Sequence, residues 1–322
     1  MLRFRGRWFL TVLILSLLIT MVVAAATASG HVQGVISYDP SLGELPEGVA
    51  VDKTGNIFVS LDPLGQLRKI SPDGTETLYA DFGSPGALGL ATDAIGNVYV
   101  ARNSGAADHG ILQVSRDGSS EHLAGTESII FPNSIAFDKR GNLYATDTIL
   151  GAVWRVPPGG SAELWLQDEL LEGLNLPTVP FPFPLGANGI AYRQGTLYVS
   201  NTEKALVLRI PILGSGGPGN IEVVASGDEL FPLDGIALDV HGDIYAAVIA
   251  QSKLVKIDAV DGTITTLATA ADGLDFPASV AFGTGMGARK SIFVTNFALG
   301  PPGGAGPGVV QVDVGQPGQP VP

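Results

Sequence analysis

The stretch FPNSIAFDKRGNLYATD, residues 131–147, has apolar side chains on both sides of the turn DKRGN, which is the pattern of a β-hairpin. Similar stretches recur five more times. They align on Gly48, Gly89, Ser134, Gly189, Gly235 and Ser279, at spacings of 41, 45, 55, 46 and 44 residues. A second hairpin follows, such as GAVWRVP, PGG and SAELWL in the third repeat. Four antiparallel strands at this period predict an all-β fold, a six-bladed β-propeller.

The two ends of the chain predict how the ring closes. The sixth repeat has only three strands, SVAFG, SIFVTNF and GVVQVDV, before the tail QPGQPVP. A spare strand, GVISYD at residues 34–39, lies near the N-terminus. We expect this strand to pair with the last blade as its outer strand, which leaves no open joint in the ring. Residues 29–322 are therefore expected to form one domain.

The first 28 residues predict export. Three arginines precede the apolar run FLTVLILSLLITMVVAAA, and the small residues A-T-A end at Ala28, as in a secretory signal peptide. A run of this length also leaves an uncleaved membrane anchor open. In both cases we expect the folded part to be secreted, periplasmic or otherwise extracytoplasmic. The absence of cysteine fits an exported protein that relies on core packing alone.

The charge of the chain argues against nucleic acid as a partner. Without the three arginines of the signal, 15 of the 18 basic residues remain against 31 acidic ones, a net charge near −16. Binding to phosphate needs the opposite sign. The acidity serves solubility, and it also suits divalent cations. We expect a monomer whose partner is a small molecule.

One position, just before the core residues of each repeat, carries an oxygen-bearing side chain in four of the six copies. In chain order this slot holds Glu47, Leu88, Asn133, Asn188, Asp234 and Ala278. The first strand of each blade lines the central channel, so these side chains form one ring. Carboxylate and amide oxygens suit Ca²⁺, and the slot has no His or Cys for zinc. The ring predicts a divalent-cation site, with turn formation as the alternative for each residue alone.

At the segments PEGVAVD, FPNSIAFD, ANGIAY and LDGIALD, the sequence resembles the senescence marker protein/gluconolactonase (regucalcin-like) family. The related paraoxonases and diisopropylfluorophosphatases belong to the same superfamily. The similarity of the repeats covers essentially all of the mature chain. The resemblance implies a divalent ion, usually calcium, on the propeller axis, in a hydrolase of lactones or related esters. The implied ligands are Glu47, Asn133, Asn188 and Asp234.

Asp234 is the candidate catalytic residue, because a carboxylate beside the cation can deprotonate an attacking water. Strand direction places every loop between second and third strands on the same rim as the slots. His109 lies in such a loop, where it could contact the substrate or carry a proton. Further candidate substrate-binding residues are Arg102, Asp147, Asn201 and Asn296, with a rim salt bridge or turn capping as the alternative.

An insertion, DELLEGLNLPTVPFPFPLGAN at residues 168–188, accounts for the spacing of 55 residues. Prolines stiffen it, and Phe181 and Phe183 belong to no expected strand. These two side chains either form an apolar flap over the pocket, as candidate substrate-binding residues, or plug the top of a blade. A flap favours a partly hydrophobic substrate such as an alkyl lactone or an aryl ester.

The sequence thus predicts an exported, divalent-metal-dependent hydrolase of lactones or related esters. One alternative is a non-catalytic NHL-type propeller that binds protein or polysaccharide, whose repeats match ALGLATDAIGNVYVA equally well. A second alternative is an enzyme like the streptogramin lyases or strictosidine synthase, which would depend on rim histidines and glutamates. Metal binding distinguishes the hydrolase from the binding propeller.

Overall fold

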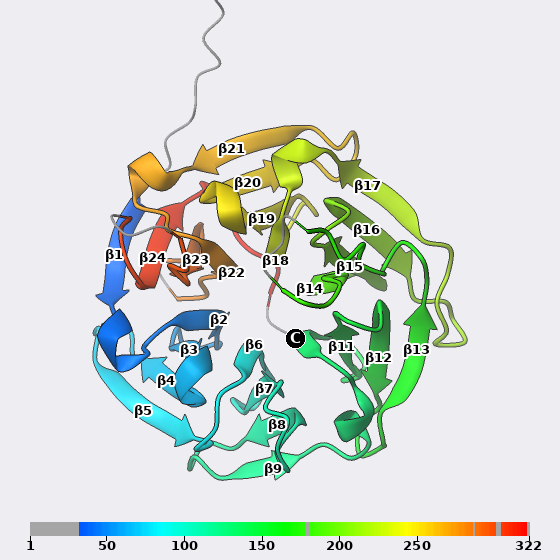
Figure 1. Cartoon of the computed structure of the whole chain (residues 1–322), viewed down its shortest axis with the longest axis horizontal. Helices are drawn as coiled ribbons and strands as arrows, with labels where there is room; N and C mark the ends of the chain where they lie inside the picture. The colour runs from blue at the N-terminus through cyan, green and yellow to red at the C-terminus, as the bar shows by residue number, and fades with distance from the viewer. Residues whose placement is uncertain (1–31, 178–180, 286, 301–303, 321–322) are drawn as a thin grey trace, which may run out of the picture.

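Six four-stranded antiparallel sheets stand in a ring around a central axis (Figure 1). The computed structural model describes residues 32–177, 181–285, 287–300 and 304–320. The predicted six-bladed β-propeller is confirmed. The predicted signal peptide, residues 1–28, lies outside the described residues. Within the described ranges, no helix has the length and apolarity needed to cross a membrane.

The first three blades follow the chain from the innermost to the outermost strand. Blade one contains β2 (Pro46–Val51), β3 (Ile57–Leu61), β4 (Gln66–Ile70) and β5 (Glu76–Asp81). Blade two contains β6 (Ala87–Thr92), β7 (Val98–Arg102), β8 (Gly110–Val114) and β9 (Ser120–His122). Blade three contains β10 (Pro132–Phe137), β11 (Leu143–Asp147), β12 (Ala152–Val156) and β13 (Glu163–Gln167).

The remaining blades repeat this order except at the last outer strand. Blade four contains β14 (Ala187–Arg193), β15 (Thr196–Asn201), β16 (Leu206–Pro211) and β17 (Glu222–Ser226). Blade five contains β18 (Leu233–Leu238), β19 (Ile244–Val248), β20 (Lys253–Ile257) and β21 (Ile264–Ala268). Blade six contains β22 (Pro277–Phe282), β23 (Ser291–Asn296), β24 (Gly308–Asp313) and β1 (Val32–Ser37). Short 3₁₀ helices in the connections are η1 (Pro40–Leu42), η2 (Asp62–Leu64), η3 (Thr126–Ser128), η4 (Asp228–Leu230), η5 (Ile249–Gln251) and η6 (Ala270–Asp272).

The N-terminal strand closes the ring, as the sequence predicts. β1 runs antiparallel to β24, with Val32 opposite Val312 and Ser37 opposite Gly308. The strand begins two residues earlier than the segment GVISYD suggests. After β24 the tail crosses the opposite rim, where the amide of Gln319 donates to the carbonyl of Leu238 at 2.9 Å. Both chain ends therefore strengthen the joint between the last blade and its neighbours.

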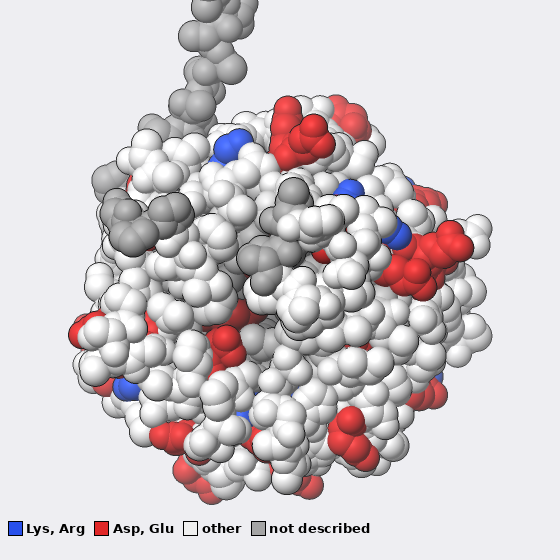
Figure 2. Space-filling view, viewed as in Figure 1, with Lys and Arg blue, Asp and Glu red and all other residues white. Residues whose placement is uncertain are grey.

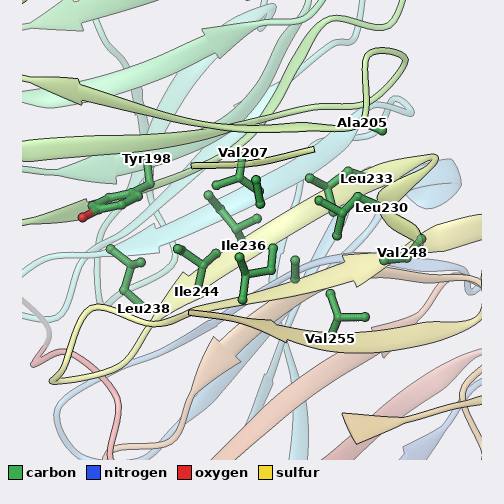
Figure 3. Packing of buried hydrophobic residues seen from close by; sticks show 13 residues of the cluster. Tyr198, Ala205, Val207, Leu230, Leu233, Ile236, Leu238, Ile244, Val248 and Val255 are labelled. Atoms are coloured by element: carbon green, nitrogen blue, oxygen red, sulfur yellow. The ribbon is translucent and has the colours of Figure 1, made fainter. Parts of the chain in front are cut away.

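The core lies between neighbouring blades, because each sheet packs both faces against other sheets. Figure 3 shows the interface of blades four and five, where Val207, Leu230 and Ile236 belong to one buried apolar cluster. Aromatic pairs join other interfaces, such as Tyr245 with Phe282 at a ring distance of 5.1 Å. β3 and β19 are buried along their full lengths. Because both faces of these strands are covered, their sequences are almost continuously apolar.

Every innermost strand contains a bulge at the predicted slot. In blade one Pro46 pairs with Leu61 and Val49 with Val59, so Glu47 and Gly48 together lie opposite Ser60. The same shift occurs in β6, β10, β14, β18 and β22. A bulge bends the strand and re-aims its side chains. The fold therefore repeats one backbone irregularity six times around the channel.

Candidate functional site

The four oxygen-bearing slot residues are buried at equivalent places around the channel. Each is the second residue of an innermost strand, and these strands contact one another in a closed circle. Their exposed fractions are 7 to 8% for Glu47, Asn133, Asn188 and Asp234. Leu88 and Ala278 are the buried apolar members of the same ring. The slots thus open on one rim, as the sequence predicts.

The environment of the two carboxylates in this ring, Glu47 and Asp234, disfavours their ionised forms. The pKa of Glu47 lies well above its ordinary value because of burial and then the negative charges of Asp234 and Asp62. Burial raises the pKa of Asp234 to about 7, and a hydrogen bond from Asn188 opposes this rise. The Oε2 atom of Glu47 is buried and has no hydrogen-bond partner. An orphaned buried acceptor of this kind normally requires a cation or donor.

The donor set fits a hard divalent cation. It consists of two carboxylates and two amides, and Asn188 Nδ2 donates to Thr202 Oγ1 at 3.0 Å, which leaves the amide oxygen of Asn188 free. In the part of the chain that is described, no three His, Cys, Asp or Glu side chains are grouped as a metal cluster. Amide oxygens would therefore have to complete the donor set, and oxygen ligands of mixed charge suit Ca²⁺.

The rim that bears the slots is mainly uncharged, with acidic atoms in its central hollow (Figure 2). Exposed or half-buried apolar residues lie in its loops, among them Leu42, Ile130, Phe181 and Leu299. The hollow is therefore an acidic site within an apolar rim.

Arg102 is fully buried at the end of β7. Its Nη2 lies 2.6 Å from Asp108 Oδ2 and 2.9 Å from the carbonyl of Ser84, and its guanidinium lies over the Phe82 ring. Nη1 is buried without a partner. The charge of Arg102 also lowers the pKa of Asp62, which burial raises. Arg102 is thus held by a rim salt bridge, with one donor group left over.

His109 lies on the rim of blade two, beside the pocket that Glu127 also lines. Its Nε2 is 2.7 Å from the carbonyl of Ile129. A carbonyl only accepts, so Nε2 carries a proton, and Nδ1 is buried without a partner. No hydrogen bond links the ring to the four slot residues.

Asp147, Asn201 and Asn296 occupy the same position at the ends of their second strands, and all three bind backbone groups. Asp147 accepts from the amides of residues 130, 131 and 150. Asn201 donates to the carbonyls of residues 170 and 172, and Asn296 to that of residue 273. These side chains tie the incoming blade connection to the rim, and each lies opposite the residue directly before a slot.

Replacing Asp147 with Ala tests this bonding. The change leaves three partly buried N–H groups without their acceptor, and we expect the free energy of unfolding to fall by about 3 kcal/mol. Urea denaturation measures the loss, and calorimetry should give an unaltered calcium affinity. Weaker calcium binding with normal stability would instead place Asp147 in the binding site.

Two phenylalanines of the insertion join a third, which directly precedes β10, in an aromatic group. The Phe183 ring lies 5.5 Å from that of Phe131, two residues before Asn133, and 5.7 Å from that of Phe181. Phe181 is 44% exposed. The carboxylate of Glu203 anchors the loop, since it accepts from the amides of residues 174, 175 and 176. Phe183 thus packs between Phe131 and the exposed ring of Phe181, and residues 174–176 are anchored by Glu203.

Three residues of the site are not evident from the repeats. Asp62 adds a third carboxylate near Glu47, Glu203 holds the insertion, and Thr202 orients Asn188. Asp62 and Thr202 each follow the second strand of a blade, at the rim. A search of the sequence for polar residues directly after each second strand could therefore have identified Asp62 and Thr202.

Fold and ring together define a six-bladed β-propeller with oxygen donors at the mouth of its channel. Residues 185–297 match the family described as SMP-30/Gluconolactonase/LRE-like region, and this segment contains Asn188 and Asp234. The resemblance predicted from the repeats is confirmed by this match. No curated protein sequence matches the chain.

Solved structures of similar proteins share the fold. A gluconolactonase from Xanthomonas campestris has 17% identity and a TM-score of 0.67, covering 92% of this chain and 93% of its own. A calcium-binding protein, regucalcin, from Agrobacterium tumefaciens has 18% identity and a TM-score of 0.67, with coverage of 91% and 96%. Virginiamycin B lyase from Staphylococcus aureus has 16% identity and a TM-score of 0.56, with coverage of 83% and 81%. At these identities the likeness concerns the fold.

Proposed function

We propose that this protein is an exported hydrolase of lactones or related esters that uses a divalent cation, most suitably Ca²⁺. The observation that carries the proposal is the pair of buried carboxylates, Glu47 and Asp234, whose pKa values are both raised and of which Glu47 has an unpartnered oxygen. The match to the gluconolactonase family over residues 185–297 supports lactone hydrolysis as the reaction class.

Glu47, Asn133, Asn188 and Asp234 are the residues that would hold the ion. The ion would supply a positive charge that polarises the carbonyl of the substrate and stabilises the negative charge formed on its oxygen. Glu47 and the amides serve as ligands. Arg102, buried and paired with Asp108, offsets part of the negative charge near Asp62.

Asp234 acts on the attacking water. Its carboxylate takes one proton as the water oxygen bonds to the carbonyl carbon of the substrate. The bond from that carbon to the ester or ring oxygen then breaks, and the departing oxygen receives the proton from Asp234. A pKa raised by burial suits a group that must both accept and return a proton near neutral pH.

The substrate has an apolar portion beside the acyl group. Phe131, Phe183 and Phe181 form an aromatic group in the loops that precede Asn133 and Asn188, and Phe181 remains exposed for contact. Aromatic surfaces of this kind bind alkyl or aryl groups. An alkyl lactone or aryl ester fits better than a highly polar sugar lactone.

Two other functions use the same fold. An NHL-type binding propeller needs no buried carboxylate pair at its axis, so Glu47 and Asp234 favour the hydrolase. A lyase of the streptogramin type would rely on rim histidines, and His109 donates its Nε2 proton to a backbone carbonyl.

Calcium titration of the metal-stripped mature protein tests the proposal. We expect one ion to bind per chain, and Asp234→Ala should lose this binding because the site loses a charged ligand. Isothermal calorimetry measures both, and a screen of lactones and esters follows. Absence of saturable binding in the wild type would refute the metal-dependent hydrolase and favour a binding propeller.

A further inference from the structure

Buried hydroxyl groups recur at one position of the second strand, immediately before its last residue. Blades one, three, four and six have Ser60, Thr146, Ser200 and Thr295 there, and all four are fully buried. Blades two and five have Ala101 and Ala247 at the same place. The position lies opposite the bulge of the innermost strand, so its side chain can reach backbone groups that the bulge leaves unpaired.

Each hydroxyl makes the same two bonds. Ser200 Oγ accepts from the amide of Gly189 in its own blade at 2.7 Å and donates to the carbonyl of Asp234 in the next blade at 2.7 Å. The other donations go from Thr146 to the carbonyl of Asn188 at 2.6 Å, from Thr295 to that of Glu47 at 2.7 Å, and from Ser60 to that of Leu88 at 2.7 Å. Hydroxyls therefore hold the backbone of three candidate ligands and of one apolar slot residue.

Close packing makes this contact specific. A Cβ atom on Gly189 would lie 2.7 Å from the Asp234 carbonyl oxygen, so only glycine lets the two backbones approach this far. The carbonyl of a slot residue sets the direction of its own Cα–Cβ bond through the shared backbone. A hydroxyl that holds the carbonyl therefore also holds the side chain aimed at the channel.

We propose that Thr146, Ser200 and Thr295 are positioning residues for the cation site, each fixing a ligand of the following blade. The proposal rests on the metal site of the proposed function and goes beyond its four ligands. Asn133 follows the blade that carries Ala101, and it has no bond of this kind.

Ser60 offers a matched control for Ser200. Both are buried serines with the same two hydrogen bonds, but Ser60 holds Leu88 whereas Ser200 holds Asp234. We expect Ser200→Ala to weaken calcium binding about 10-fold or more, in the range found for groups that orient metal ligands. Ser60→Ala loses the equivalent bond from the amide of Gly48, next to Glu47, but the carbonyl that it releases belongs to Leu88, which is not a ligand. Its calcium affinity should therefore stay within about twofold of the wild type.

The experiment measures calcium affinity by calorimetry on metal-stripped full-length mature protein and the melting temperature without calcium. Both serine variants should melt a few degrees lower to a similar extent, and only Ser200→Ala should lose affinity. Ser200→Thr should restore it, because threonine serves at the equivalent Thr146 and Thr295. If Ser200→Ala is too unstable to titrate, Thr146→Val removes the hydroxyl that holds Asn188 and should weaken binding in the same way.

The results separate this proposal from the one on which it rests. A wild type that binds no calcium refutes the metal site itself. A wild type that binds calcium, with equal affinities for Ser60→Ala and Ser200→Ala, overturns the positioning role. A loss of affinity that Ser200→Thr does not restore also overturns it, because the hydroxyl is then not the group that matters.

Discussion

Raising the pH from about 5 to about 8 should destabilise the calcium-free protein, because the folded chain must ionise buried carboxylates that water solvates well in the unfolded chain. The pKa of Asp234 rises from 3.8 to about 7 on folding, and that of Glu47 rises well above 4.5. At pH values between the unfolded and the folded pKa of Asp234, the native state binds more protons than the unfolded state. Stability is therefore fully present below pH 4 and falls as the pH approaches and passes 7.

Asp234 alone accounts for a loss of about 4 kcal/mol from below pH 4 to above pH 7, since each tenfold change in proton affinity corresponds to about 1.4 kcal/mol. About 3 kcal/mol of this loss falls between pH 5 and 8. Saturating calcium should reverse the trend, because the ion binds the ionised carboxylates of the native state. Urea denaturation at several pH values, with chelator or with calcium, measures both effects.

The double variant Glu47→Gln with Asp234→Asn is the control for this dependence. It removes these two titrating groups and keeps similar volumes, so its stability should vary much less between about pH 5 and 8, with Asp62 as the remaining carboxylate of raised pKa at this rim. If the free energy of unfolding of the calcium-free wild type varied with pH as little as that of the double variant, the pKa values of Glu47 and Asp234 would not be raised by folding.

Asp234→Asn should reduce the turnover of a lactone or ester at saturating calcium by about 10²- to 10⁴-fold, the usual contribution of a general base. The amide keeps an oxygen for the cation but cannot accept the proton of water. We expect kcat to fall with much less change in KM, because the aromatic group of Phe131 and Phe183 is untouched.

Glu47→Gln distinguishes the loss of a charged metal ligand from the loss of the general base. This variant also removes one negative charge from the ring, so its calcium affinity should fall. At saturating calcium its kcat should stay within about tenfold of the wild type, because Asp234 still accepts the proton. Full turnover in Asp234→Asn would exclude Asp234 as the base and direct attention to Asp62.

The repeats predicted the fold because a propeller is a local pattern copied six times. Each blade needs only hairpins with turns such as DKTGN, where Asp52 accepts from the amides of Thr54 and Asn56, and Gly55 takes a positive φ. The slot ring followed from strand order alone, since equivalent positions on innermost strands must lie at equal heights around the axis. Closure by β1 followed from counting strands.

The roles of individual rim residues could not be read in the same way. Asp147, Asn201 and Asn296 resembled substrate-binding candidates in sequence, yet each binds backbone groups of an incoming loop. Arg102 looked equally available and is fully buried against Asp108. The hydrogen-bond partner of a polar rim side chain depends on the conformation of the connecting loops, and the repeat pattern does not predict that conformation.

By itself, then, the sequence determined the number of blades and the ring from Glu47 to Asp234, because period and register depend on nearest neighbours in the chain. It also determined the strand that closes the ring, because the last repeat has one strand too few and the N-terminal segment has one to spare. Only the tertiary structure decided which buried atoms remain unpaired, how far burial raises the pKa of Asp234, and that Ser200 reaches across to the next blade. These depend on the distance between residues remote in sequence, and packing of whole blades sets that distance.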